Sequence, residues 1–231
     1  IAERMDWKLD LYTKIAPHVA PAAIVASNTS GLSITKLSEV LPESLKPQFC
    51  GIHFFNPPRY MALLELIPTE YTQPEVVDQL EAFSTSAVGK SVIRAYDTPN
   101  FIANRVGVFS ILATFHHTKA FGLGFDEVDA LTGTLIGRPK SATYRTADVV
   151  GLDTLAHVIG TMKDTLPEDP WHRYFEVPDW FRRLLDDKAL GQKSGKGVYR
   201  KQGKEIQVLD SAGGQYRSSG GEADASVVEI L

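Results

Sequence analysis

The chain has 231 residues, a hydrophobic content of 43% and a formal net charge of −4. This length and composition support a buried core in one large domain or two modest ones. The negative charge argues against a general nucleic-acid-binding surface, and no apolar run is long enough to span a bilayer. The single cysteine, Cys50, excludes an internal disulfide, and with no signal-peptide pattern present we expect a cytoplasmic location.

Helix and strand patterns alternate in the first part of the chain. The expected elements are a helix to about residue 19, a strand over 23–26, a helix over 34–41, strands over 48–55 and 62–67, a helix over 74–88 and a strand over 90–96. Such alternation predicts an α/β fold. We therefore assign residues 1–96 to the C-terminal half of a Rossmann-like, doubly wound domain.

The patterns after residue 96 are almost entirely helical. Helices are expected over 99–121, 125–136, 141–149, 151–165 and 178–188. Thr98 is a natural N-cap and Pro99 a natural first helical residue, so the first of these helices should begin there. We expect an all-α domain over 97–200. Residues 201–231 mix charge with glycine and are interpreted as a tail or linker, with room for one short hairpin.

The run from Gly51 to Pro58 carries the strongest chemical signal. Two successive prolines cannot continue a sheet ladder, so the chain should turn there and place His53 at a strand end. Glu65 follows twelve residues later, where a returning strand could meet the imidazole. A carboxylate that accepts from one ring nitrogen fixes the tautomer and makes the histidine an oriented general base. The alternative is a core histidine beside an exposed glutamate.

Two further segments offer polar groups near strand or helix ends. Small polar residues from Ser27 to Gly31 follow a short buried strand, at the position where open α/β sheets bind ligands. The alternative is a simple turn in which Ser30 or Ser33 is the N-cap of the next helix. Asn104 lies in the first turns of a strongly apolar helix and should be a buried amide that needs partners. A hydrogen bond to a neighbouring loop would also satisfy it.

Five motifs occur in a fixed order along the chain. They are Ser27-Asn28-Thr29-Ser30, Gly51 to Pro58, Leu64-Glu65-Leu66-Ile67, Asp97 to Arg105, and Gly191 to Tyr199. Together they resemble the L-3-hydroxyacyl-CoA dehydrogenase family, from about residue 2 to residue 200. The resemblance implies NAD-dependent oxidation of the 3-hydroxyl of a fatty acyl-CoA to a ketone, a step of β-oxidation. It also implies that the helical domain binds the acyl-CoA substrate and forms a homodimer.

The resemblance assigns catalytic roles to four residues. His53 matches the general base that takes the hydroxyl proton, and Glu65 matches the carboxylate paired with it. Ser30 and Asn104 match the residues that hold the substrate's 3-oxygen. These roles suit hydride transfer, which needs a base for the proton and donors around the forming carbonyl.

The resemblance also marks four positions on the cofactor side. Asn28 matches a nicotinamide contact, and Asn56 lies in the motif directly behind the base. Glu3 and Lys8 fall where the family has cofactor-proximal residues. No metal site is expected, because the adjacent His116 and His117 point about 100° apart on a helix and lack a Cys or acidic cluster.

One departure from the family pattern concerns the turn that binds the pyrophosphate of NAD. The family begins with a strand, a Gly-x-Gly-x-x-Gly turn and a helix, and no such unit occurs in these 231 residues. The chain starts at Ile1 inside an amphipathic helix, so we expect a fragment that is inactive on its own. Because it runs on past the motif ending at Tyr199, we expect a multifunctional β-oxidation parent.

Two rival interpretations remain. The chain could be a non-catalytic dimerisation module whose His53 and Glu65 are inherited but idle. A 6-phosphogluconate-type dehydrogenase would also join a Rossmann domain to a helical one, but such enzymes typically use a lysine base, and the His-Phe-Phe-Asn-Pro run argues against them. Two lysines, Lys193 and Lys196, could contact a coenzyme A phosphate or lie in a solvated loop. Five aromatic residues are expected to pack in the core rather than to line a pocket for the acyl chain; they are Trp171, Tyr174, Phe175, Trp180 and Phe181.

Overall fold

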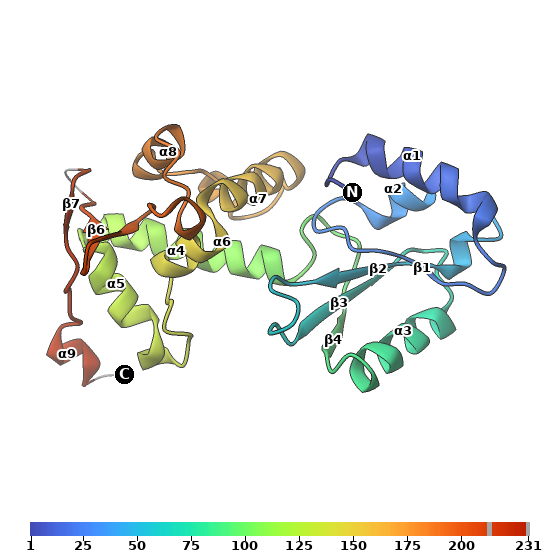
Figure 1. Ribbon diagram of the computed structural model, residues 1–231, viewed down its shortest axis with the longest axis horizontal. Coiled ribbons are helices and arrows are strands. Elements are labelled where there is room, and N and C mark those ends of the chain that lie inside the picture. Colours follow the sequence, from blue (N-terminus) through green and yellow to red (C-terminus); the bar gives the residue numbers. More distant parts are fainter. Residues whose placement is uncertain (212–213, 230–231) are drawn as a thin grey trace. The chain divides into compact units, whose positions relative to one another are not determined.

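The computed structural model describes residues 1–211 and 214–229, and it divides into two compact units, 1–105 and 106–231 (Figure 1). The predicted boundary lay nine residues earlier, after residue 96. The difference arises because residues 97–105 are hydrogen-bonded to and packed against the first unit. No helix in the described ranges is long and apolar enough to cross a membrane.

The first unit is built on a four-stranded mixed sheet. Its strands are β1 (Val25–Ser27), β2 (Phe49–Phe54), β3 (Leu63–Pro68) and β4 (Ser91–Arg94), in the order β1-β2-β3-β4. β1 is parallel to β2 and β3 is parallel to β4, whereas β2 and β3 are antiparallel. The predicted α/β fold is confirmed, and the turn expected after residue 55 does reverse the chain.

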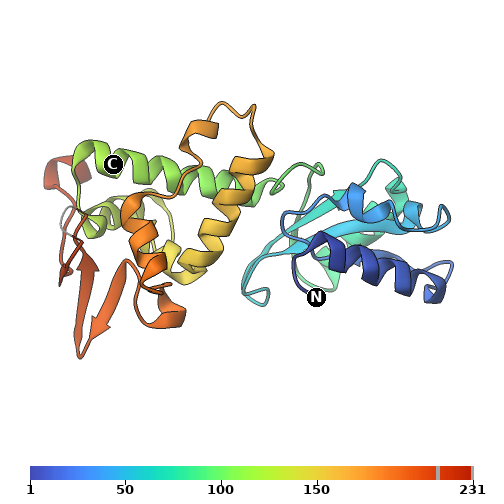
Figure 2. The same ribbon diagram turned by 90° about the horizontal axis from the view of Figure 1, so that it is seen from above.

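Helices cover both faces of this sheet. α1 (Met5–Ile15) and α2 (Ile34–Ser38) lie on one side and α3 (Pro74–Ser86) on the other, and Figure 2 looks onto the side that carries α1 and α2. Short 3₁₀ turns, η1 (Ala16–His18) and η2 (Lys46–Gln48), follow α1 and precede β2. The sheet is therefore the middle layer of three, as in other α/β domains.

The alternation of side chains along the strands decides what each face carries. Phe49 and Ile67 pack with the α1 and α2 side chains, whereas Leu64 and Leu66 pack with Val77 of α3. Successive strand residues point to opposite faces, so His53 shares its face with Phe49. Glu65 likewise shares its face with Ile67. Both site residues thus point to the α1 and α2 side of the sheet.

The segment from Asp97 to Ala103 closes the first unit. Asp97 accepts hydrogen bonds from the Ser33 hydroxyl at 2.8 Å and from the backbone amides of Ile34 and Thr35, at the start of α2. Asn100 and Phe101 have positive φ angles of 61° and 51°. That left-handed backbone cannot belong to a helix, so the expected helix start at Pro99 is wrong.

The second unit is mainly helical, as predicted. The long helix α4 (Ala103–Phe121) enters it from the first unit and is followed by α5 (Phe125–Thr132), α6 (Tyr144–Val150), α7 (Leu152–Thr165), α8 (Asp179–Asp186) and α9 (Ala225–Val228), with short 3₁₀ turns η3 (Thr134–Ile136), η4 (His172–Tyr174) and η5 (Gln192–Ser194). Phe175 and Phe181 are buried in its core and Trp180 packs against it, whereas Trp171 is 46% exposed. Tyr174 is half-buried and is not part of that core, so core packing accounts for three of the five aromatic side chains expected there.

The predicted tail contributes a sheet to the second unit. β5 (Tyr199–Gln202), β6 (Glu205–Leu209) and β7 (Tyr216–Ser218) form an antiparallel meander, and Val208 and Leu209 are buried in the core of the unit. Arg217 donates to both carboxylate oxygens of Asp126 in α5, at 2.6 and 3.0 Å. Residues 199–218, apart from the undescribed 212–213, therefore belong to the folded unit and are not a linker.

A buried carboxylate explains the glycines of the Gly191 to Tyr199 motif. Asp148 accepts from the backbone amides of Val198 and Tyr199 at 2.9 and 2.8 Å. A Cβ on Gly197 would lie 2.1 Å from the Asp148 Oδ1 atom, so only glycine fits there. Burial raises the pKa of Asp148 to about 6 against the effect of these two amides. This contact holds the motif in place. Lys193, one of the two lysines considered for coenzyme A, makes an ion pair with Asp153.

We predict that Gly197→Ala lowers the free energy of unfolding by about 2–3 kcal/mol, because the added methyl group overlaps the Asp148 carboxylate. Urea unfolding followed by circular dichroism measures this. Gly160→Ala in α7 is the matched control, since its Cβ would meet nothing within 4 Å, and it should be neutral or stabilising by up to about 1 kcal/mol. Equal effects of the two variants would contradict the proposed fit.

Candidate active site

The pair His53 and Glu65 forms the centre of the candidate site. The two residues lie directly opposite each other in the antiparallel β2 and β3 pairing. His53 Nδ1 is 2.8 Å from Glu65 Oε2, and the two side chains are 4% and 0% exposed. Since a carboxylate only accepts, the hydrogen-bond network assigns the proton to Nδ1 and leaves Nε2 with a free lone pair. The imidazole is thus oriented as a proton acceptor.

Glu65 also holds the first residues of α4. Its second oxygen, Oε1, accepts from the backbone amides of Ile102 and Ala103 at 3.0 and 2.8 Å. The first amides of a helix have no partner within the helix, and a carboxylate satisfies them and suits the positive end of the helix dipole. One carboxylate therefore joins the histidine to the start of the helix that carries Asn104.

These three hydrogen bonds set the charge state of Glu65. Burial raises the pKa of the carboxyl, but the hydrogen bonds from His53 and from the amides of Ala103 and Ile102 outweigh it. The net effect is a pKa below the ordinary value. Glu65 is therefore ionised at neutral pH and can balance a positive charge on the imidazole.

Two aromatic rings enclose the imidazole. The ring centroids of Phe55 and Phe101 lie 4.5 and 5.6 Å from that of His53. His53 is 3% exposed as a result. The low polarity around the pair strengthens its electrostatic interaction relative to water.

The end of β1 lies beside the end of β2. Asn28 Oδ1 accepts from the backbone amide of Phe54, next to His53, at 3.0 Å. Ser33, and not Ser30, is the N-cap of α2. The hydroxyl of Ser30 is therefore not used as a cap, and its side chain stays exposed. The predicted ligand-binding position at this strand end thus keeps unused polar groups.

Glu3 meets the same loop from the N-terminal segment, and Lys8 pairs with Glu3. Glu3 Oε1 accepts from the backbone amides of Ser30 and Gly31 at 2.8 and 3.3 Å. The ammonium of Lys8, which is buried, lies 3.3 Å from Glu3 Oε2. The structure thus brings Glu3 to the loop that follows β1, with Lys8 paired to it.

Asn104 and Asn56 lie at the edges of the site. The Asn104 amide nitrogen is 3.4 Å from the backbone oxygen of Ser30, a long hydrogen bond, and the residue is half-buried rather than buried as expected. Asn56 is exposed, and its side chain makes no hydrogen bond with the residues that the structure describes. Of the eight predicted site residues, six are joined in two groups by hydrogen bonds or ion pairs, Asn28 binds the amide next to His53, and Asn56 contacts none of the others.

Several contributors were not predicted from the sequence. The amides of Ile102 and Ala103 belong to the backbone and have no residue signature, and the rings of Phe55 and Phe101 look like ordinary core residues. Asp97 lies inside a recognised motif, but its bond to α2 depends on the fold. In the described ranges no cluster of three metal-ligating side chains occurs.

Comparison with protein families matches nearly the whole chain to one family. Residues 1–98 match the 3-hydroxyacyl-CoA dehydrogenase NAD binding domain, and residues 101–201 match the 3-hydroxyacyl-CoA dehydrogenase C-terminal domain. The two matches meet between residues 98 and 101, close to the point where the structure changes from sheet to helix.

Known proteins show the same likeness. A probable 3-hydroxyacyl-CoA dehydrogenase of Bacillus subtilis is 43% identical over 210 residues, which are 91% of this chain and 26% of that protein. A probable 3-hydroxyacyl-CoA dehydrogenase of Deinococcus radiodurans is 42% identical over 87% of this chain and 57% of its own length. The chain therefore spans about a quarter to just over half of these relatives.

A solved structure supports the fold. The (S)-3-hydroxybutyryl-CoA dehydrogenase PaaH1 of Ralstonia eutropha superposes with a TM-score of 0.77 at 30% identity, over 87% of this chain and 68% of that one. Fold and matches define the class as dehydrogenases with a Rossmann-like NAD-binding domain and a helical C-terminal domain. The chain belongs to the 3-hydroxyacyl-CoA dehydrogenase family.

We predict that Glu65→Gln lowers the free energy of unfolding by about 2–4 kcal/mol at pH 7, because a buried charge-assisted pair is lost. The pKa of Glu65 is lower in the folded state, so its contribution is present above the unfolded pKa and disappears as the pH falls through the folded value. The two proteins should therefore converge at acid pH. Urea unfolding followed by amide signals of β2 and β3 measures this.

Glu43→Gln is the control for that experiment. Glu43 makes a surface ion pair with Lys46 and is 85% exposed, so its replacement should change stability by no more than about 1 kcal/mol. A Glu65→Gln difference that stayed constant from pH 7 to pH 3 would show that the carboxylate charge is not what stabilises the site.

Proposed function

We propose that this chain carries the catalytic side chains of an NAD-dependent (S)-3-hydroxyacyl-CoA dehydrogenase, which oxidises the 3-hydroxyl of a fatty acyl-CoA to a 3-ketone in β-oxidation. The observation that supports this most directly is the buried hydrogen bond between His53 Nδ1 and Glu65. It is the geometry that an oriented general base requires. Family membership supports the proposed substrate class.

His53 takes the proton in the proposed reaction. With Nδ1–H donated to Glu65, Nε2 accepts the proton of the substrate's 3-hydroxyl. Bound NAD supplies the chemistry that the side chains lack, by accepting the hydride from C3. Glu65 stays ionised, so it stabilises the imidazolium that forms at His53.

Ser30 and Asn104 hold the 3-oxygen in this proposal. The exposed hydroxyl of Ser30 and the amide of Asn104 both offer N–H or O–H donors, and the Asn104 amide already reaches the Ser30 backbone oxygen. Donors aimed at the oxygen stabilise the charge that develops as the carbonyl forms.

The cofactor side consists of Asn28, Glu3, Lys8 and Asn56. Asn28 uses its carbonyl oxygen within the protein, which leaves its exposed NH₂ group for a nicotinamide amide. Polar groups at the end of β1 fit the nicotinamide half of NAD. The turn that would bind the pyrophosphate of NAD is lacking, because no Gly-x-Gly-x-x-Gly sequence occurs in the 231 residues.

Several features of the whole protein belong to the same proposal. Lacking the glycine-rich turn, the chain alone should bind NAD weakly and be inactive. A multifunctional parent is supported by a Rickettsia prowazekii protein named as a fatty acid oxidation complex trifunctional enzyme, 37% identical over 87% of this chain and 28% of its own length. Homodimerisation through the helical domain and a cytoplasmic location stay predictions.

We predict that His53→Gln in the full-length protein lowers kcat by about 10²–10⁴-fold, because the general base is lost. The affinity for acyl-CoA should change little, since the proton acceptor adds little to ground-state binding. Steady-state kinetics with 3-hydroxybutyryl-CoA and a binding titration separate the two effects. Retained turnover in this variant would remove His53 from the role of base.

Calorimetric titration of this chain with acetoacetyl-CoA, with and without NADH, tests which half of the site it holds. We expect acyl-CoA binding whose affinity NADH leaves unchanged. The 231 residues lack the glycine-rich turn that binds the cofactor pyrophosphate, whereas the side chains proposed to contact the substrate are present. Glu43→Gln, which changes only a surface ion pair, serves as the folded control. Absence of acyl-CoA binding would contradict an intact substrate half and favour the non-catalytic dimerisation module.

A further inference from the structure

The loop over residues 55–62 connects the strand of His53 to the strand of Glu65. Residues 56–62 are all exposed, so this part of the loop has no core packing to hold it, and only its last residue, Ala62, is bonded to the sheet, through the amide of Ser91 at 2.8 Å. Its own backbone forms one turn, in which the amides of Tyr60 and Met61 donate to the carbonyl of Pro57 at 3.0 and 3.1 Å. Exposed segments with few buried contacts open most readily. Something outside the loop is needed to keep it in place.

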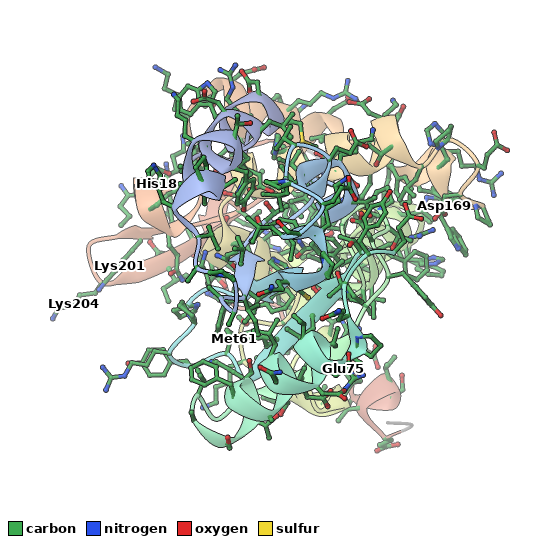
Figure 3. The ribbon with its side chains drawn as sticks, turned by 90° about the vertical axis from the view of Figure 1, so that its right-hand side faces the viewer. His18, Met61, Glu75, Asp169, Lys201 and Lys204 are labelled. Atoms are coloured by element: carbon green, nitrogen blue, oxygen red, sulfur yellow. The ribbon has the colours of Figure 1, made fainter. Side chains whose placement is uncertain are left out.

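Lys90 supplies that anchor. Its ammonium donates to the carbonyl oxygens of Pro58 and Met61, the latter at 2.6 Å, and Figure 3 labels Met61. Among the side chains that the structure describes, no other forms a hydrogen bond with residues 55–62. The backbone amide of Lys90 donates to the carbonyl of Ser84 at 2.9 Å, so the anchor is itself fixed to the end of α3.

The burial of Lys90 is unusual for a residue of this type. It is 8% exposed, and in the described ranges no carboxylate forms an ion pair with it. Lysine is seldom fully buried, and removing an ammonium from water is unfavourable unless hydrogen bonds replace the lost solvation. The two loop carbonyls provide that replacement. The ammonium and the loop therefore depend on each other.

Phe55 links the loop to the base. It is the first loop residue, and its ring lies 4.5 Å from the His53 imidazole. We propose that Lys90 is a positioning residue that holds the loop over 55–62 against the start of β4, and thereby keeps the Phe55 ring over His53 and water away from the His53 and Glu65 pair. The catalytic meaning of this rests on the proposed function; the structural effect does not.

Replacing Lys90 in the present chain tests the proposal. Lys90→Met keeps the length of the side chain but removes its donors, whereas Lys90→Arg keeps a cation that can donate. In Lys90→Met we expect the amides of Tyr60 and Met61 to exchange with deuterium about tenfold faster or more. We expect a similar increase in the modification of His53 by diethyl pyrocarbonate, with the exposed His18 and His157 as internal standards.

Two comparisons make the result specific. Lys90→Arg should restore most of the protection. Arg94→Met also removes a cation, at the other end of β4, where Arg94 pairs with the surface residues Asp78 and Glu81; it should leave both readouts unchanged. Unchanged exchange and modification in Lys90→Met, or an equal increase in Arg94→Met, would overturn the proposal.

A measurement on the unaltered chain covers the case in which Lys90→Met does not fold. The amides of Tyr60 and Met61 should exchange at least about tenfold more slowly than those of Gly203 and Lys204, which lie in the exposed turn between β5 and β6. Equal exchange rates at the two sites would overturn the proposal that Lys90 anchors the loop. None of these readouts depends on turnover, so loss of the proposed dehydrogenase activity would leave them unaffected.

Discussion

The Glu65 carboxylate is the group on which the candidate site depends. One oxygen accepts from His53 and the other from the first amides of α4, so a single buried side chain fixes the imidazole and the start of the helix with Asn104. A buried carboxylate is unfavourable unless its lone pairs are satisfied, and here three donors satisfy it. The same bonds that make the site rigid also keep Glu65 charged.

A similar arrangement recurs in the second unit with a different result. Asp148 is also a buried carboxylate that accepts two backbone amides, yet burial raises its pKa to about 6, whereas the pKa of Glu65 is lowered. Burial is the largest influence on both pKa values; the hydrogen bonds from His53 and two backbone amides outweigh it at Glu65, whereas two backbone amides do not outweigh it at Asp148. The first carboxylate orients the His53 imidazole, and the second fixes the glycine-rich turn before β5.

Family membership and local geometry contribute different parts of the functional argument. The matches over residues 1–98 and 101–201 establish the family. They do not decide how this chain holds His53 in place. That part rests on contacts, namely the pairing of β2 with β3, the rings of Phe55 and Phe101, and the anchoring of the intervening loop by Lys90.

The sequence predicted the alternation of helices and strands and the turn after Phe55, because periodicity and paired prolines act locally. It left the pairing of His53 with Glu65 open against a core histidine beside an exposed glutamate, and the family resemblance favoured the pair. The sequence misplaced the start of α4, since Asn100 and Phe101 adopt left-handed backbone that only contacts with the rest of the unit stabilise. The tertiary structure alone decided which backbone amides bind Glu65 and which carbonyls bind Lys90. Backbone groups are the same in every residue, so folding alone determines which side chains they meet.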